Sequence, residues 1–200
     1  MTKTVLYLRH SIKNNDGELS PEGFKLSERI ARIVQGEFGQ EEYGQKLTDK
    51  IIHSGSPRAR QTAQTLAETL KISELLENAE LITPFRKELE EIFAHPLFRE
   101  GDTMALKQID DELQTHFVKR EGLRLKKVIE NLASEIEDGE TMMVVGHGNN
   151  SCLALVMGFK IPIVPIGDEM VDTISMKPLY GLKLRISANT IIGGEFFTPY

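Results

Sequence analysis

The chain has 200 residues, of which 40% are hydrophobic and 27% are charged. These values are typical of a globular protein with a substantial core, and they exclude a disordered or collagen-like chain. The formal net charge of -6 argues against a general nucleic-acid-binding or membrane-surface protein, because both need a basic face.

The sequence has no sign of an internal division. We expect one domain over residues 1–200, because no repeat, low-complexity tract or Pro/Gly-rich linker interrupts it. The single cysteine, Cys152, excludes an internal disulfide and favours a reducing compartment. The apolar run "VLYL" is too short for a signal peptide, and no run approaches the ~20 residues of a membrane span. We therefore expect a cytoplasmic protein with no membrane association.

The first elements alternate between strand and helix. "TVLYL" (4–8) is short, apolar and β-branched, and it predicts a buried strand. "LSPEGFKLSERIARIV" (19–34) predicts a helix, with Ser20 as its N-cap and Pro21 in the first helical position.

The same order is repeated in the next segment. "DKIIHSG" (49–55) predicts a second strand, and "SPRARQTAQTLAETL" (56–70) predicts a helix capped by Ser56. "AELITPF" (79–85) is a candidate third strand, and the region after it, residues 86–102, has poor periodicity and predicts an irregular excursion.

Two apolar stripes predict two helices in the second half of the chain. "TMMVVGHG" (141–148) then predicts a strand that leads into a helix at 150–159, and the tail predicts closing strands or hairpins. The stripes consist of Leu106, Ile109, Leu113 and Phe117, and of Leu125, Val128, Ile129, Leu132 and Ile136.

This alternation predicts an α/β three-layer sandwich, with a mostly parallel central sheet flanked by helices. The carboxyl ends of parallel strands share one edge of a sheet, and ligands bind outside that edge. Arg9-His10, the segment 54–58 and Gly146-His147 all lie at such ends. We therefore expect them to form one rim, with His10 facing solvent.

Arg58 indicates what the rim binds. It lies in the first turn of its predicted helix, where unpaired N–H groups and the helix dipole disfavour a cation unless an anion joins it. Arg60 lies in the same turn, and two arginines there are typical of a phosphate site. The alternative is that either side chain extends into water, and this alternative is stronger for Arg60. His10 and His147 taken singly also have an alternative, as ordinary surface or turn histidines.

Together these motifs resemble those of the histidine phosphatase superfamily, also called phosphoglycerate mutase-like. "LYLRHS" (6–11), "LSPEG" (19–23), "RARQTA" (58–63) and "GHG" (146–148) are similar to that family's motifs and occur in its order. The resemblance spans roughly residues 4 to 158 and implies a phosphoglycerate mutase-like fold.

The resemblance also implies roles for the rim residues. His10 would be the nucleophile that forms a phosphohistidine, and Arg9, Arg58 and His147 would form the phosphate pocket, with Ser11 and Gly148 beside it. Such a site needs no cofactor. The five histidines and one cysteine show no metal-ligand spacing, so we expect no metal site.

The family's general acid is a glutamate in a segment similar to "ELEEIF" (88–93). Glu91 is the candidate, because it follows Leu89 with the matching spacing. Glu88 and Glu90 compete for the role, and all three carboxylates also fit an ordinary solvated face.

Several departures from the family's pattern favour a phosphatase. Ser11 replaces the usual glycine, and it either adds a hydroxyl near phosphate or fills space. The mutases' segments after the first motif and after the acidic residue are missing, and "FAHPLFREGD" (93–102) stands in the second place. His95 and Arg99 in that segment either contact substrate or lie on the surface.

We therefore expect a metal-independent phosphatase that works through a phosphohistidine on His10. Its substrate would be a small phosphorylated metabolite or a phosphohistidine protein, and we expect no nucleic-acid partner. The alternatives are a phosphoglycerate mutase-type phosphotransferase and a non-catalytic module that binds a phosphorylated ligand. The sequence does not determine the oligomeric state.

Overall fold

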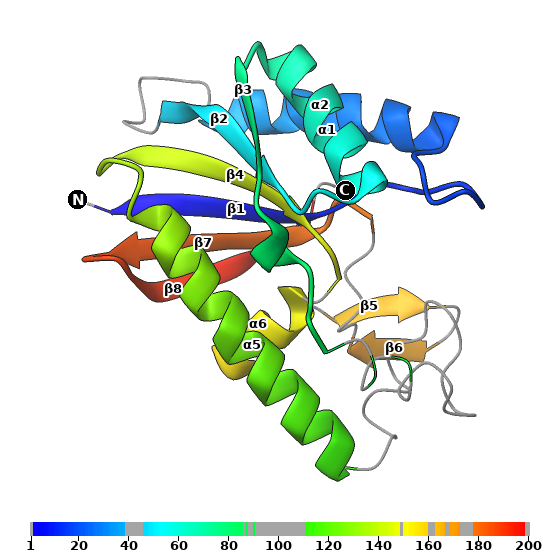
Figure 1. Cartoon of the computed structure of the whole chain (residues 1–200), viewed down its shortest axis with the longest axis vertical. Helices are drawn as coiled ribbons and strands as arrows, with labels where there is room; N and C mark the ends of the chain where they lie inside the picture. Colours follow the sequence, from blue (N-terminus) through cyan, green and yellow to red (C-terminus); the bar gives the residue numbers. More distant parts are fainter. Residues whose placement is uncertain are drawn as a thin grey trace.

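A computed structural model of the chain describes residues 2–38, 46–85, 87, 90, 111–148, 150–159, 163–166, 169–172 and 178–198. Its centre is a six-stranded sheet with the strand order β3-β2-β4-β1-β7-β8, and helices lie on both faces (Figure 1). The strands of this sheet are β1 (Lys3–Arg9), β2 (Lys46–His53), β3 (Glu74–Glu77), β4 (Glu140–Gly146), β7 (Gly181–Ser187) and β8 (Thr190–Phe197). The helices are α1 (Pro21–Phe38), α2 (Pro57–Leu70), the 3-10 helix η2 (Ala79–Leu81), α5 (Asp111–Ala133) and α6 (Asn150–Val156).

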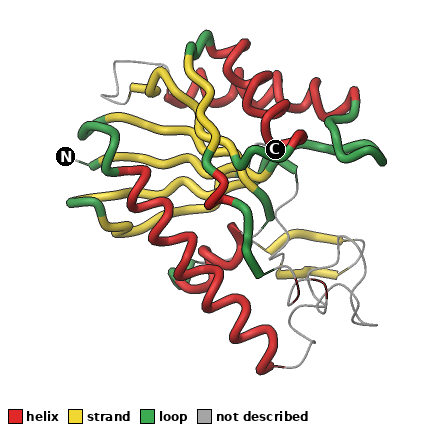
Figure 2. The backbone as a smooth tube through the Cα atoms, viewed as in Figure 1, coloured by secondary structure: helices red, strands yellow, loops and turns green. Residues whose placement is uncertain are grey.

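The four strands β3, β2, β4 and β1 are parallel neighbours. β7 pairs antiparallel with β1, and β8 pairs antiparallel with β7. A separate two-stranded antiparallel sheet is formed by β5 (Ile163–Ile166) and β6 (Glu169–Asp172). The strands of the main sheet form one layer between helices (Figure 2), which confirms the predicted three-layer α/β fold with its mostly parallel sheet.

Strand β1 shows how the sheet divides the core. Val5 and Tyr7 point to the face covered by α5 and α6, where they pack in one buried cluster with residues such as Leu125. Leu6 and Leu8 point to the other face, into the cluster under α1 and α2. Successive side chains of a strand alternate between faces, so the apolar and aromatic run of residues 5–8 in β1 is what a strand covered on both sides requires.

The third strand differs from the prediction. It is Glu74–Glu77 and not 79–85, and the latter segment begins with the 3-10 helix η2. The Asn78 side chain accepts a hydrogen bond from the N–H of Glu80, which favours a turn at that point. All four residues of β3 are exposed at the edge of the sheet, so the strand has no apolar alternation to predict it.

The predicted pair of helices is also wrong in one respect. Phe117 and Leu125, which were placed in different stripes, belong to the single helix α5. Leu106 and Ile109 lie outside the described residues. Ile136 is buried but follows the end of α5. The tail prediction is confirmed, because β7 and β8 form an antiparallel hairpin.

The two predicted N-caps have different outcomes. The Ser20 hydroxyl accepts a hydrogen bond from the N–H of Gly23 at 3.1 Å, which confirms it as the cap of α1. Ser56 precedes α2 and Pro57 begins it, but the Ser56 side chain makes no capping hydrogen bond. The first turn of α2 therefore keeps N–H groups that its cap residue does not satisfy.

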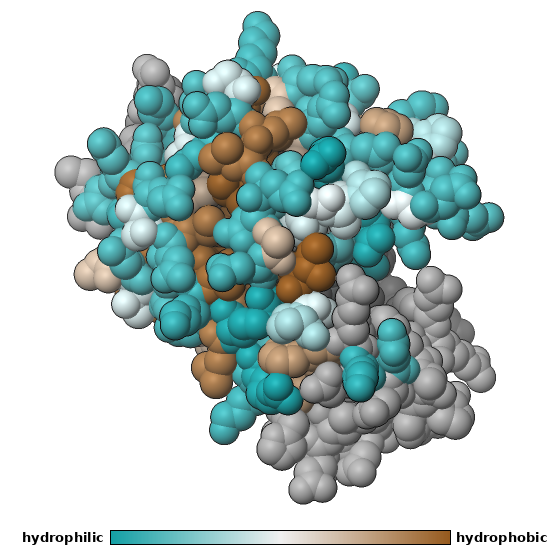
Figure 3. All heavy atoms as spheres, in the orientation of Figure 1, coloured by the Kyte–Doolittle hydropathy of each residue, from teal (hydrophilic) through white to brown (hydrophobic). Residues whose placement is uncertain are grey.

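Polar side chains cover much of the face in Figure 3, and apolar ones gather in its middle, where β3 and η2 lie in Figure 1. Leu75 and Leu76 of β3 are 37% and 41% exposed. Within the part of the chain that the structure describes, no helix combines the length and the apolar character needed to cross a membrane.

Helices α5 and α6 approach each other closely at Gly122. A Cβ atom at this position would lie 2.5 Å from the main-chain oxygen of Cys152 and 2.7 Å from a methyl group of Val156. Both distances are shorter than real contacts, so only glycine allows α6 to pack at this separation. This matters for the site, because α6 begins directly after the "GHG" segment.

We expect Gly122→Ala to lower the free energy of unfolding. Alanine favours a helix by about 1 kcal/mol over glycine, but overpacking against main chain costs about 1–3 kcal/mol. Gly36→Ala is the matched control, since nothing lies within 4 Å of its Cβ position in α1, and it should raise stability by about 0.5–1 kcal/mol. Urea unfolding of both variants checks this, and equal gains would contradict the close packing.

Candidate active site

Three strand ends meet at the carboxyl edge of the parallel strands. Arg9 of β1 is paired in register with Gly146 of β4, and the N–H of His10 donates to the Gly146 carbonyl at 3.0 Å. The N–H of Ser54, directly after β2, donates to the carbonyl of Val145 at 3.1 Å. These hydrogen bonds extend the sheet beyond its last regular pairs. They confirm the predicted rim, because they bring the segments after β1, β2 and β4 together.

The hydrogen bonds of His10 define its protonation. Its Nδ1 lies 2.8 Å from the carbonyl oxygen of Ser11, which can only accept, so Nδ1 carries the proton. Its Nε2 receives a hydrogen bond from Nε of Arg58 at 2.9 Å, and a guanidinium can only donate. His10 is therefore a neutral imidazole whose Nε2 presents a lone pair to the rim.

The expectation that His10 faces solvent is wrong, because only 6% of its surface is exposed. Arg58 lies against its Nε2, and the ring of His147 lies 5.4 Å away in an edge-on orientation. Burial lowers the pKa of His10 to about 3, and the positive charges of Arg58 and Arg9 act in the same direction. The hydrogen bond to Ser11 opposes this shift but does not cancel it.

His147 is held between β2 and α2. Its Nε2 lies 2.9 Å from the Ser54 hydroxyl, and its Nδ1 makes a long 3.5 Å contact with a terminal nitrogen of Arg58. Since Arg58 can only donate, this arrangement corresponds to a neutral ring that donates from Nε2 to Ser54. Burial lowers the pKa of His147 to about 4, followed by the charges of Arg58 and Arg9.

Arg9 and Arg58 bring two guanidinium groups to the same rim. A Cβ atom at Gly148 would be 3.7 Å from the Arg9 guanidinium carbon, so the glycine lies directly beside it. Burial lowers the pKa of both arginines, and for Arg9 the charge of Arg58 adds to the effect. Two cations and two buried neutral imidazoles form a site whose field favours an anion.

Helix α2 positions Arg58. The Thr62 hydroxyl donates to the Arg58 carbonyl at 2.8 Å and accepts from the N–H of Ser11 at 3.0 Å. The Gln61 side chain accepts from the N–H of Leu19 at 2.7 Å. The "RARQTA" segment thus ties the start of α2 to the loop that follows His10. Arg60 makes an exposed ion pair with Glu77 at 2.9 Å, in keeping with a surface position.

The Ser11 side chain points to helix α1. Its hydroxyl donates to the main-chain oxygen of Gly23 at 2.8 Å, and the residue is fully buried. The proton of this hydroxyl is therefore used within the protein, which favours the space-filling interpretation of Ser11 over direct substrate binding.

The space beside Gly146 is occupied by a side chain of the protein, that of Tyr7. A Cβ atom there would lie 2.3 Å from the Tyr7 hydroxyl oxygen, and that hydroxyl receives a hydrogen bond from the main-chain N–H of His147. Sequence reasoning missed Tyr7, whose signal is a hydroxyl group within the buried run of residues 5–8 in β1. It also missed Ser54 as the partner of His147, although Ser54 directly follows a predicted strand.

The candidate general acid lies outside the described residues, as do Glu88, His95 and Arg99. The candidate general acid is Glu91, and its position relative to His10 stays a prediction. Glu90 is described and exposed. Among the residues that the structure describes, no group of three or more His, Cys, Asp or Glu side chains has an arrangement that could hold a metal ion.

No protein-family model matches the sequence, and no curated protein matches it. Solved structures do match. A phosphoglycerate mutase from Bacillus anthracis superposes with a TM-score of 0.60 at 14% identity, covering 98% of this chain and 91% of that chain. A mycobacterial glucosyl-3-phosphoglycerate phosphatase gives a TM-score of 0.56 at 16% identity, covering 97% and 95%. A phytase from Klebsiella sp. ASR1 gives 0.55 at 13% identity, covering 92% and 78%.

The chain has the phosphoglycerate mutase-like fold. These matches over nearly the whole length confirm the fold that the resemblance implied. The structural neighbours include both phosphatases and mutases, and one of the phosphatases is described in complex with VO3.

The two depressed histidine pKa values predict acid sensitivity. In the unfolded chain both imidazoles take up protons below pH 6.5, whereas in the folded protein His10 and His147 stay neutral down to about pH 3 and about pH 4. Their contribution to stability is therefore complete above pH 6.5 and is lost as the pH falls towards the folded values. Each contributes a slope of up to about 1.4 kcal/mol per pH unit.

We expect His10→Asn to reduce the slope of the unfolding free energy against pH by up to about 1.4 kcal/mol per pH unit, which corresponds to one proton. His147→Asn should reduce the slope in the same way, over a pH range that ends at about pH 4 and not at about pH 3. The double variant should lose both contributions to the slope. Urea unfolding across a pH series measures these slopes. A slope unchanged by either substitution would mean that the buried imidazoles do not titrate abnormally.

Proposed function

We propose that the protein is a metal-independent phosphatase that hydrolyses phosphomonoesters through a phosphohistidine on His10. One observation carries this proposal: His10 is held neutral, with its Nε2 lone pair on the rim, beside two guanidinium groups. A neutral imidazole is a competent nucleophile, and guanidinium groups bind the phosphoryl oxygens in paired hydrogen bonds. The fold it shares with known phosphatases supports the proposal without identifying the reaction.

In the first step Nε2 of His10 attacks phosphorus, and the bond between phosphorus and the ester oxygen breaks. The leaving oxygen takes a proton from a general acid, for which Glu91 is our candidate. The proton on Nδ1 stays on the ring throughout and is donated in a hydrogen bond to the Ser11 carbonyl. This hydrogen bond stabilises the positive charge that develops on the ring. The products of this step are a free alcohol and a phosphohistidine.

In the second step water attacks the phosphohistidine, and the phosphorus–nitrogen bond breaks. The Glu91 carboxylate formed in the first step accepts a proton from this water. Inorganic phosphate leaves, and both His10 and Glu91 return to their starting protonation states. Atoms and charge balance with no further reactant.

Arg58 must change partner during this cycle, because its Nε donates a hydrogen bond to the His10 lone pair that attacks phosphorus. A bound phosphoryl group offers the guanidinium anionic oxygens in place of the imidazole nitrogen, and charge-assisted bonds of this kind are the stronger ones. The same anion would raise the pKa of His147 and allow it to donate to phosphate as an imidazolium.

We propose that the substrate is a small phosphorylated metabolite or a phosphohistidine protein. Among the described residues, the groups at the rim are cations and imidazoles that suit a phosphoryl group, and they do not distinguish one alcohol from another. A screen of purified protein against phosphorylated metabolites and phosphohistidine peptides, with released inorganic phosphate as the readout, identifies the class. Transfer of phosphate to a second phosphoglycerate, without release to water, would instead indicate a mutase.

We expect a phosphoenzyme that is labile in acid and stable in alkali, because phosphorus bound to an imidazole nitrogen has this behaviour. His10→Ala should abolish both the phosphoenzyme and turnover. Ser11→Ala is the control, since its hydroxyl is bonded to Gly23 and the neighbouring nucleophile remains. Rapid quenching with a labelled substrate measures the intermediate. An acid-stable label, or turnover in His10→Ala, would overturn the mechanism.

Glu91→Gln tests the general acid through its dependence on the leaving group. An alkyl alcohol leaves poorly as an anion, so hydrolysis of an alkyl phosphate should slow by ~10²–10⁴-fold, the usual contribution of general acid catalysis. A nitrophenolate needs no proton, so phosphorylation of the enzyme by an aryl ester should be affected much less. Glu88→Gln and Glu90→Gln are the controls. An equal loss on both substrates would assign Glu91 a structural or substrate-positioning role.

A further inference from the structure

Glu121 is a buried carboxylate on the apolar face of α5. Its side chain is 0% exposed, and it lies one helical turn from both Phe117 and Leu125, which are buried. Arg124 satisfies both of its oxygens, with Nε at 2.8 Å from one and a terminal nitrogen at 2.7 Å from the other. An ion pair around a buried carboxylate adds little stability over an apolar pair of similar volume, so the presence of Glu121 in the core points to another role.

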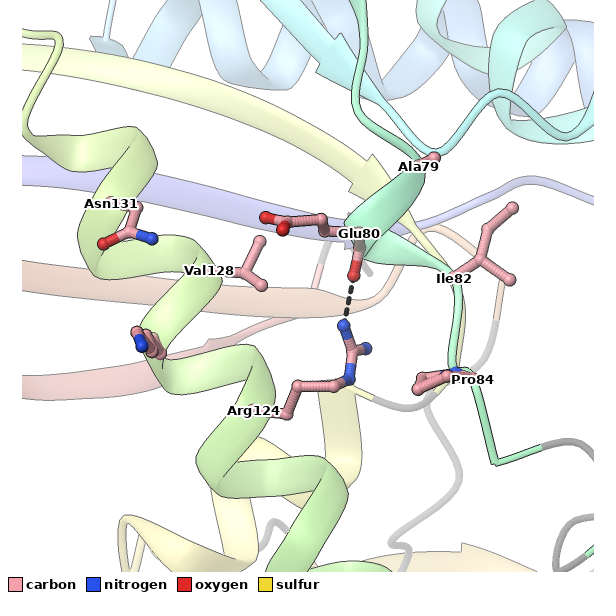
Figure 4. A pocket seen from close by; sticks show the side chains of 8 residues that line it. Ala79, Glu80, Ile82, Pro84, Arg124, Val128 and Asn131 are labelled. Atoms are coloured by element: carbon pink, nitrogen blue, oxygen red, sulfur yellow. Dashed lines mark hydrogen bonds between the residues drawn. The ribbon is translucent and has the colours of Figure 1, made fainter.

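Arg124 also reaches the segment after β3. Its remaining terminal nitrogen donates a hydrogen bond to the main-chain carbonyl of Glu80 in η2, as Figure 4 shows. The same arginine lines a pocket of about 490 Å³ between η2 and α5, together with Ile82 and Pro84. The ion pair therefore connects α5 to the segment whose continuation carries Glu91.

On its inner side, α5 packs against the face of β1 that carries Tyr7. This tyrosine is fully buried in β1, two residues before Arg9, and it packs in the same cluster as Leu125 of α5. Burial raises the pKa of Tyr7, the Glu121 charge raises it further, and the Arg124 charge opposes the rise. The Tyr7 hydroxyl in turn accepts a hydrogen bond from the main-chain N–H of His147.

We propose that Tyr7, Glu121 and Arg124 act as positioning residues that hold the main chain of His147 at the phosphate site. This proposal rests on the proposed function only for the role of His147 itself. The hydrogen bond from Arg124 to the η2 carbonyl and the Glu121–Arg124 pair fix the face of α5 that packs against β1. The Tyr7 hydroxyl of β1 is in turn hydrogen-bonded to the His147 amide. The hydrogen bond of Tyr7 is to the main-chain N–H of His147, so we expect its effect to act through the backbone at residues 146–148.

The Gly122 contact supports this assignment. Gly122 follows Glu121, and it is the point at which α5 packs against Cys152 and Val156 of α6. The segment from His147 to α6 is therefore held at its beginning by Tyr7 and at its end by α5. A displacement of the His147 amide would move an imidazole that must meet phosphate within a fraction of an ångström.

Tyr7→Phe tests the proposal most directly, because it removes only the hydroxyl. We expect kcat on a phosphomonoester to fall by ~10–100-fold, the scale of loss from a misplaced group, with a KM change of less than about threefold. Glu121→Gln should give a similar split, and the double variant should lose much less than the product of the two single losses. Glu130→Gln is the matched control, since Glu130 is also paired with a cation, Lys126, on α5 but lies about 14 Å further along the helix.

A structural role alone would lower the thermal unfolding midpoint without changing the behaviour of the folded enzyme. All assays therefore run well below each variant's midpoint, and ¹⁵N NMR follows the amide and imidazole of His147. We expect both His147 signals to shift in Tyr7→Phe and to stay in place in Glu130→Gln. Unchanged His147 signals with wild-type kcat in Tyr7→Phe would overturn the proposal.

The NMR measurement also separates this proposal from the proposed function. If the wild-type protein releases no phosphate from any ester and forms no phosphoenzyme, the proposed function fails. The change in the His147 signals in Tyr7→Phe still tests the positioning role. Vanadate titration of the wild-type protein and of Tyr7→Phe shows whether this positioning affects ligand affinity. A shifted His147 with unaltered vanadate affinity and kcat would show that the contact exists but positions nothing, which also overturns the proposal.

Discussion

The site depends on burying two imidazoles beside two guanidinium groups. Burial alone makes a charged histidine costly, and the neighbouring cations make it more so, which keeps His10 and His147 neutral. Neutrality leaves a lone pair on Nε2 of His10, which accepts from Arg58, because the ring's one proton is on Nδ1 and is donated in a hydrogen bond to the Ser11 carbonyl. The same group of residues therefore combines a positive field that favours an anion with a neutral imidazole that suits a nucleophile.

Holding four such groups at one edge requires support from every layer of the fold. The parallel strands deliver three chain segments to that edge, and hydrogen bonds beyond the last ladder pairs keep those segments adjacent. Helix α2 adds Arg58, and its Thr62 joins the loop after His10 to the helix backbone. Helix α5 covers the opposite face of the sheet, where its residue Leu125 lies in the same buried cluster as Tyr7 of β1. Most of these supporting contacts are made by main-chain groups or by side chains to which we assign no catalytic role.

The rim was predictable from sequence because it follows from topology. Once β1, β2 and β4 are identified as buried parallel strands, Arg9-His10, Ser54 and His147 must share an edge. The burial of His10 was not predictable in this way, since it depends on where the Arg58 side chain and the His147 ring lie. Strand β3 escaped prediction because both of its faces are exposed, and Asn78 turned the expected strand into a 3-10 helix.

Other features are visible in the sequence but are misinterpreted when helices are predicted from apolar periodicity alone. Glu121 occupies a core position of α5, and a charged residue within an apolar stripe looks like a break in the pattern. It is in fact continuous with the helix that carries Phe117 and Leu125. The direction of the Ser11 hydroxyl is likewise a matter of three-dimensional contacts, because the sequence alone allows it to face either phosphate or α1.

The contact between Gly146 and Tyr7 has an evolutionary consequence. The two positions lie on neighbouring strands and share a single volume, since a Cβ atom at 146 would overlap the tyrosine hydroxyl. A relative that carries alanine or a larger residue at 146 must therefore have a shorter side chain at 7, and it must satisfy the amide of residue 147 by another donor–acceptor arrangement. Positions 7 and 146 should consequently vary together, and the "GHG" segment can change its first glycine only after β1 has changed.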